Sequence, residues 1–178
     1  MNPEVNNWLQ LLFRWLHVVA GVIWIGHLYF FNWVNAHFVK TLDGPTKQAV
    51  VPQLLPRALY WFRWGAAWTW ISGFVLAGLV YYMGEQVFEE PGGAPMAWLG
   101  IFLVLLAVGF VVYNAVMKSV KNVIAANTIV LVLFLGFYFF LEFVGGFGGR
   151  SLYIHAGMIF GTVMALNVWM VIWPAQKR

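Results

Sequence analysis

Residues 15–38 read WLHVVAGVIWIGHLYFFNWVNAHF, and this stretch decides the fold. It is apolar over more than the roughly 20 residues that a helix needs to cross a bilayer. It nevertheless contains histidines, and an ionisable side chain at membrane depth is costly unless it has a partner or a task. We therefore interpret the stretch as a membrane-spanning helix whose histidines are bonded or functional.

The composition extends this interpretation to the whole chain. Of 178 residues, 62% are hydrophobic and 9% are charged, and the mean hydropathy is +0.79. An ordinary soluble domain has about 25% charged residues, so this chain is expected to lie in a lipid bilayer. The basic residues gather at the ends of apolar segments, which gives no indication of nucleic-acid binding. Cysteine is absent, which excludes disulfides, iron–sulfur clusters and covalent haem through a C-x-x-C-H motif.

Four more apolar stretches are long enough to span, and strand-like alternation is weak throughout. The sequence predicts an all-α membrane protein with five transmembrane helices in one bundle, forming a single domain over residues 1–178. Residues 41–56 contain Asp43-Gly44-Pro45 and two further prolines, which predicts a loop with room for a short surface helix. The predicted spans are residues 15–38, 58–83, 95–117, 123–143 and 151–173.

The charges predict the orientation, because excess Lys and Arg face the cytoplasm. The side of the N-terminus has two basic residues, Arg14 and Arg150, against five glutamates. We therefore expect the N-terminus outside and the C-terminus in the cytoplasm, in a bacterial inner membrane. The N-terminus has no basic region or cleavage site typical of a signal peptide, so the first segment is expected to be retained. The basic residues of the other side are Lys40, Lys47, Arg57, Lys118, Lys121, Lys177 and Arg178.

Arg63 lies slightly inside the predicted cytoplasmic boundary, and its side chain is expected to extend toward the interface. Tryptophan and tyrosine residues near predicted helix ends are typical of the aromatic belt at the membrane surface. Tyr81, Tyr82 and Trp173 belong to this group. Trp24 falls in the middle of a span, where its ring needs a partner or a packed cofactor.

His17 and His155 are the strongest candidate ligands. His17 follows Arg14 by three residues, about 4.5 Å along a helix, and His155 follows Arg150 by five, about 7.5 Å. Because the first and fifth helices run in the same direction, the two rings are expected at nearly the same depth. Two imidazoles can bind the iron of a non-covalent haem b from opposite faces, while arginines meet its propionates at the boundary. The alternative is that each histidine forms an interhelical hydrogen bond.

The pocket around His17 would include Gly21, one turn away on the same face, and Trp24. His27 fits the pair poorly, because it lies about 15 Å deeper and is rotated by some 80°. It could ligate a second haem, line a proton or quinone path, or bond a neighbouring asparagine or backbone carbonyl.

The run Arg14-Trp15-Leu16-His17, followed by Gly21, Trp24, Ile25 and Gly26, resembles the N-terminal membrane domain of PuuD-type urate oxidases (urate hydroxylases). The segment Tyr153-Ile154-His155-Ala156-Gly157 is similar to the same domain. The first helix more distantly resembles HemJ-type protoporphyrinogen oxidases and copper-resistance membrane proteins. The urate oxidases join a longer membrane domain to a cytochrome c, and this sequence has no C-x-x-C-H motif. The resemblance therefore implies a separate cytochrome c, or a larger membrane complex, as electron acceptor.

The leading hypothesis is a haem b membrane protein that transfers electrons, as an oxidoreductase or a subunit of one, with urate as the substrate that the resemblance implies. One alternative is a small transporter or channel with a polar path along His27, Asn32, Asn35 and Asn167, which predicts a colourless protein. The other is a non-catalytic subunit whose glycine- and alanine-rich helix faces dock in a larger complex.

Overall fold

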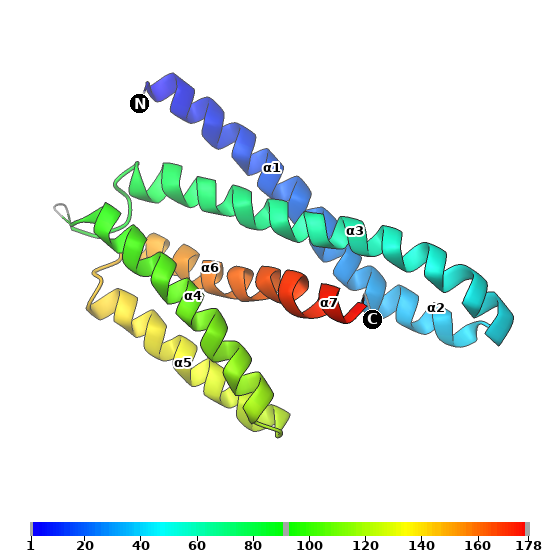
Figure 1. The fold of residues 1–178 in the computed structure, drawn as a ribbon. Helices are drawn as coiled ribbons and strands as arrows, with labels where there is room; N and C mark the ends of the chain where they lie inside the picture. Colours follow the sequence, from blue (N-terminus) through cyan, green and yellow to red (C-terminus); the bar gives the residue numbers. More distant parts are fainter. Residues whose placement is uncertain (1, 91–92, 177–178) are drawn as a thin grey trace. The chain divides into compact units, whose positions relative to one another are not determined.

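The structure, a computed structural model, describes residues 2–90 and 93–176. Within these residues it is built from helices, with no extended strand and an isolated β-bridge between Phe88 and Phe147. Five helices are long and apolar enough to cross a membrane, as the sequence predicts. They are Pro3–Thr41, Gly44–Tyr82, Pro95–Ser119, Val123–Phe143 and Gly149–Gln176 (Figure 1).

Three of the five contain a π-helical turn. The first consists of α1 (Pro3–Tyr29), η1 (Phe30–Asn35) and α2 (Ala36–Thr41), and the second of α3 (Gly44–Ala77) and η2 (Gly78–Tyr82). The fifth consists of α6 (Gly149–Asn167), η3 (Val168–Ile172) and α7 (Trp173–Gln176). The third and fourth helices are α4 (Pro95–Ser119) and α5 (Val123–Phe143), regular throughout and within two residues of their predicted bounds.

The first helix begins well before its predicted start because its N-terminus is capped. The side-chain oxygen of Asn2 accepts a hydrogen bond from the backbone N–H of Glu4 at 2.9 Å. Pro3 occupies the first helical position, where its missing N–H costs nothing, and Glu4 stabilises the positive end of the helix dipole. The polar residues before Trp15 therefore extend the apolar span as regular helix.

The predicted loop over residues 41–56 is wrong for most of its length. Asp43 caps α3 by accepting a hydrogen bond from the N–H of Thr46 at 3.2 Å, so Asp43-Gly44-Pro45 starts a helix. Pro52 and Pro56 lie inside α3, where each proline removes one backbone hydrogen bond. The helix continues through both prolines because neighbouring residues keep their own bonds.

The helices form two compact units, and each is described by itself. Unit 1 contains Met1–Val75 and Asn167–Arg178, and unit 2 contains Leu76–Leu166. Both boundaries fall inside continuous helices, α3 and α6. The prediction of one domain stays a prediction.

In unit 1, α1 packs closely against α3 in antiparallel direction (Figure 1). Gly65 allows this approach, because a Cβ atom there would lie 3.0 Å from the backbone nitrogen of Trp24 and 3.3 Å from the carbonyl oxygen of Ala20. Phe31 and Phe62 continue the contact edge to face at 5.5 Å. These small and aromatic residues make the core of unit 1.

In unit 2, α4 and α5 run side by side and an aromatic core joins them to α6 (Figure 1). Phe102 of α4 is fully buried, and Phe134 of α5 lies 4.3 Å from Phe160 of α6 between ring centroids. The outer faces expose apolar side chains such as Val111 and Ile124, which is consistent with contact with a lipid bilayer.

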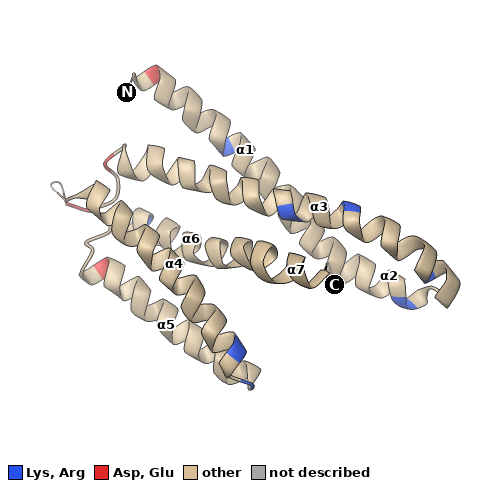
Figure 2. Ribbon diagram, in the orientation of Figure 1, with Lys and Arg blue, Asp and Glu red and all other residues tan. Residues whose placement is uncertain are grey.

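Most lysines and glutamates lie near helix ends or in the connections, whereas Arg14, Arg57 and Arg63 lie within α1 and α3 (Figure 2). In unit 1, Lys40 and Lys47 flank the connection between α2 and α3. In unit 2, Lys118 and Lys121 flank the connection between α4 and α5, while Glu142 lies at the other end of α5. Each unit therefore has a basic end, and the side of a membrane that these ends face stays a prediction.

Candidate functional site

His17 lies on α1 and faces α3. Its Nδ1 atom is 2.9 Å from the carbonyl oxygen of Thr69 and 3.1 Å from the hydroxyl oxygen of Ser72. Because a carbonyl can only accept, Nδ1 carries the hydrogen and donates it. Ser72 is fully buried and donates its own hydrogen to the carbonyl of Trp68 at 2.6 Å. The imidazole is thus held in one tautomer, with Nε2 as the nitrogen able to accept a proton or bind a metal.

Glycine makes the room for the His17 ring. A Cβ atom on Gly73 of α3 would lie 2.9 Å from Cε1 of His17, closer than real Cβ contacts. Gly21 follows on the same face of α1, where a Cβ atom would lie at ordinary distance, 3.9 Å, from the Thr69 methyl group. Any larger residue at position 73 would have to displace the imidazole.

The predicted pocket residues divide into two groups. Trp24 is buried where α1 packs on α3, so it shares with His17 and Gly21 the face of α1 turned to α3. Arg14 is exposed, and its guanidinium donates to the Gln10 side chain on its own helix at 3.0 Å. Arg14, one turn before His17, is therefore exposed and bonded to an uncharged side chain.

His155 is fully buried in unit 2. Its Nδ1 atom donates to the carbonyl oxygen of Ser151, one turn earlier on α6, at 2.7 Å. Its Nε2 atom lies 2.9 Å from the hydroxyl oxygen of Tyr82, at the end of η2. Since Nδ1 carries the hydrogen of the neutral ring, the Tyr82 hydroxyl donates to Nε2.

Four aromatic rings surround the His155 imidazole at steep angles. The nearest centroids are those of Phe102 at 4.7 Å and Phe147 at 4.9 Å, and the rings of Tyr81 and Tyr82 both lie at 5.6 Å. The sequence predicts Tyr81 and Tyr82 as interfacial residues, but both are buried inside unit 2. The rings fix the imidazole plane and exclude water from it.

Both candidate ligands therefore share one hydrogen-bonding arrangement, in which Nδ1–H donates to a backbone carbonyl. Metal-binding histidines commonly have this outer partner, because it fixes the tautomer and orients Nε2 toward the metal. His17 and His155 belong to different units, so their pairing on one iron stays a prediction. Within residues 2–90 and 93–176, no cluster of three or more His, Cys, Asp or Glu side chains could hold a metal ion.

His27 has a local partner. Its Nδ1–H donates to the carbonyl oxygen of Ile23 on the same helix at 2.7 Å, and its ring contacts Phe31. The Nδ1–carbonyl bond alone thus does not distinguish a ligand from a satisfied core histidine. His17 and His155 differ from His27 because each also contacts a side chain of another helix, and His155 is in addition enclosed by four aromatic rings.

Arg150 is exposed in the first turn of α6, five residues before His155. The partners that sequence reasoning missed are Thr69, Ser72 and Gly73 around His17, and Tyr82, Phe102 and Phe147 around His155. One signal for the first group was present in the sequence. Ser72 and Gly73 follow Thr69 by three and four residues, which places both beside Thr69 on one face of α3.

The family model described as "Urate oxidase N-terminal" matches residues 3–49 and 41–178. These ranges include both histidines, both arginines and every residue around the two rings. No curated protein and no solved structure matches the chain significantly. The match covers nearly the whole chain, so this protein belongs to the urate oxidase N-terminal family.

Proposed function

We propose that this chain is a haem b-binding membrane module that carries electrons for an oxidoreductase reaction, with urate as its substrate. Membership of the urate oxidase N-terminal family supports the oxidoreductase class. Five helices of spanning length support a location in a bilayer. Haem binding, electron transfer and the substrate are the parts that we propose.

One observation carries the proposal. His17 and His155 each donate Nδ1–H to a backbone carbonyl, at 2.9 and 2.7 Å, which leaves Nε2 as the basic nitrogen; unlike His27, each ring also bonds a side chain of another helix, Ser72 or Tyr82. Neutral imidazoles with a fixed Nε2 suit a six-coordinate haem iron. Exposed Arg14 and Arg150 lie one to two turns before these rings and would pair with the propionates.

The residues around His17 fit such a cofactor, whereas those around His155, which is fully buried and bonded at Nε2, would have to open for it. At His17, Gly73 and Gly21 keep side-chain bulk away from the ring, and Trp24 supplies an apolar wall. At His155, the Tyr82 hydroxyl bonds the same nitrogen that would bind iron, so this hydroxyl must turn away. A bound haem b supplies reversible one-electron transfer, and the surrounding aromatic side chains keep water from it.

The charge distribution supports the orientation that goes with this function. With the basic ends of both units in the cytoplasm, Arg14, His17, Arg150 and His155 lie near the outer face of a bacterial inner membrane. Urate would lose two electrons on that side. They would leave one at a time to a separate cytochrome c or to a larger membrane complex.

Electron flow from urate tests this function. Purified chain in lipid nanodiscs, loaded with haem b, is mixed with urate and soluble ferric cytochrome c, and cytochrome reduction is followed by absorption. The proposal predicts reduction that depends on both urate and the chain, and that is lost in His17→Ala. Haem-loaded protein that never passes electrons from urate would leave the haem assignment intact and exclude urate.

A further inference from the structure

Arg63 lies in the corner formed by two tryptophan rings in unit 1, whose planes are inclined at 77°. Its guanidinium carbon lies 3.9 Å from the ring centroid of Trp173 and 5.0 Å from that of Trp169. The indole N–H of Trp169 also donates to the backbone carbonyl of Arg63 at 3.2 Å. Trp64 contacts Trp169 edge to face at 5.5 Å, which completes an aromatic cluster around this arginine.

The cluster stabilises the cation without neutralising it. Cation–π contacts occupy the faces of the guanidinium plane, whereas hydrogen-bond acceptors approach its edge. The Nε atom is buried and has no hydrogen-bond partner among the described residues. An arginine placed in this way has donors for an acceptor that the cluster does not contain.

Among the described residues of unit 1, no acidic side chain lies near enough to serve. The sequence of this unit includes two acidic residues, Glu4 and Asp43. Asp43 precedes α3 and is about 30 Å from Arg63 along the helix. Glu4 lies at the start of α1. Because α1 and α3 are antiparallel, the contact between His17 and Ser72 lies between Glu4 and Arg63, so Glu4 is far from Arg63. The described acidic side chains of this unit therefore do not neutralise Arg63.

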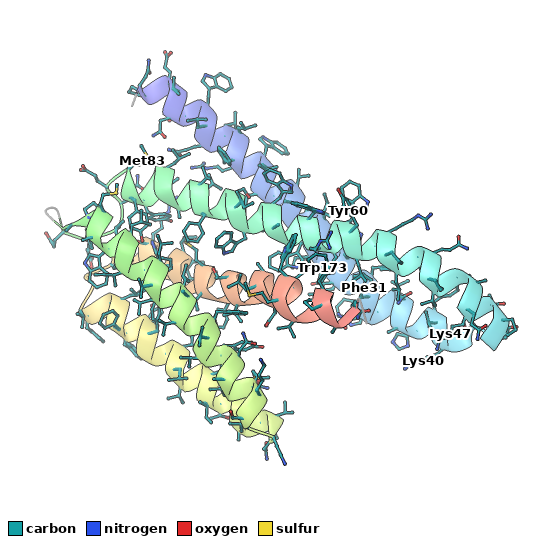
Figure 3. All side chains as sticks on the ribbon, in the orientation of Figure 1. Phe31, Lys40, Lys47, Tyr60, Met83 and Trp173 are labelled. Atoms are coloured by element: carbon teal, nitrogen blue, oxygen red, sulfur yellow. The ribbon has the colours of Figure 1, made fainter. Side chains whose placement is uncertain are left out.

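The position of Arg63 along α3 indicates which class of anion could reach its guanidinium. From Trp64 to Tyr82 the helix extends about 27 Å, close to the thickness of the hydrocarbon core of a bilayer. Tyr60 and Trp61 are more than half exposed, as residues of an aromatic belt are. Lys40 and Lys47 lie further out, at the end of the α2–α3 connection (Figure 3). Arg63 thus lies within one turn of the aromatic belt, at the basic end of the unit, and its long side chain can extend to the level of the lipid phosphates.

We propose that Arg63, with Trp169 and Trp173, binds the phosphate of an acidic phospholipid such as phosphatidylglycerol. Phosphate oxygens match the edge of a guanidinium, and the tryptophan rings provide an apolar surface for the start of the acyl chains. Phosphatidylglycerol has no choline cation beside its phosphate, so the guanidinium of Arg63 favours this anionic headgroup over a zwitterionic one. This site is independent of the proposed haem function.

Native mass spectrometry of the full chain, released from micelles with equimolar phosphatidylglycerol and phosphatidylcholine, tests the site. The wild type is expected to retain phosphatidylglycerol preferentially. Arg63→Gln reduces this preference about fivefold, the effect of one basic residue at a membrane surface. The matched control is Arg57→Gln on the same helix, because Arg57 is exposed and bonds the carbonyl of Gln53; it keeps the preference.

Arg63→Lys keeps the charge but loses the planar fork, and it is expected to bind the lipid with intermediate preference. If Arg63→Gln does not fold, the lipid preference of Arg63→Lys is compared with that of the wild type instead. Inorganic phosphate added at the same concentration should not displace the lipid, since the acyl chains contribute to binding. Equal retention of the two lipids by the wild type, or an equal loss of preference in Arg57→Gln, would overturn the proposal.

Discussion

The Tyr82 hydroxyl oxygen lies 2.9 Å from Nε2 of His155, at the centre of the unit 2 core. This bond joins the end of η2 to α6 across 73 positions of sequence. Both side chains are almost fully buried, so water cannot replace either partner. This hydrogen bond therefore affects both the stability of unit 2 and the availability of Nε2 of His155.

Replacing Tyr82 with phenylalanine tests this link. The variant leaves a buried imidazole nitrogen without a donor, which costs about 1–3 kcal/mol in the free energy of unfolding. Tyr81→Phe is the control, because Tyr81 touches His155 through its ring, which phenylalanine preserves. Thermal unfolding in detergent should show a lower Tm for Tyr82→Phe than for Tyr81→Phe. Equal values would mean that the hydroxyl contributes nothing to stability.

Gly73→Ala should disturb His17 directly. Its Cβ atom would lie 2.9 Å from Cε1 of a ring that is already bonded to Thr69 and Ser72, so the ring or the two helices must move. We expect the free energy of unfolding to fall by about 1–3 kcal/mol, the usual cost of overpacking. Gly26→Ala on α1 meets no atom within 4 Å and should leave stability unchanged or higher. A stable Gly73→Ala variant would show that His17 is not confined in this way.

Asn122 stabilises the start of α5. Its side-chain oxygen accepts hydrogen bonds from the N–H groups of Ile124 and Ala125, at 3.0 and 3.1 Å. Asn122→Ala removes this cap and should reduce the free energy of unfolding by about 1 kcal/mol. Asn122→Ser, which can still cap, should retain most of the stability in the same denaturation measurement. The cap has no role if the two variants unfold alike.

The absence of cysteine permits a direct test of orientation, because one introduced thiol is the only reactive one. Glu90→Cys should react with a membrane-impermeant maleimide in intact cells, since the acidic end is expected outside. Lys47→Cys, at the basic end, should react only after the membrane is permeabilised. The reverse labelling pattern would contradict the proposed orientation.

The apolar length of each segment was sufficient to predict five helices, and for α4 and α5 nearly their bounds. It failed at the starts of α1 and α3, because polar residues before an apolar span can continue the helix when Asn2 or Asp43 provides a cap. The sequence signal at Asp43 was present, but the glycine and prolines after it were interpreted as a loop.

Candidate ligands could be found from sequence, but their partners could not. His17 and His155 stand out as ionisable residues in apolar helices. That His17 meets Ser72, and His155 meets Tyr82, depends on which helices are neighbours and on how they are rotated. Periodicity along one helix does not determine these relationships. Tyr82 is also the last residue of a π-helical turn, where the regular period of 3.6 residues does not apply.

Haem ligation by His17 and His155 is the central claim, and a visible absorption spectrum tests it most directly. The purified chain with haem b should show a Soret band and sharp α and β bands when reduced, as bis-histidine haem does. We expect His17→Ala and His155→Ala each to lose this spectrum, while the control His27→Ala retains it. A colourless wild type, or full spectra in both ligand variants, would contradict it.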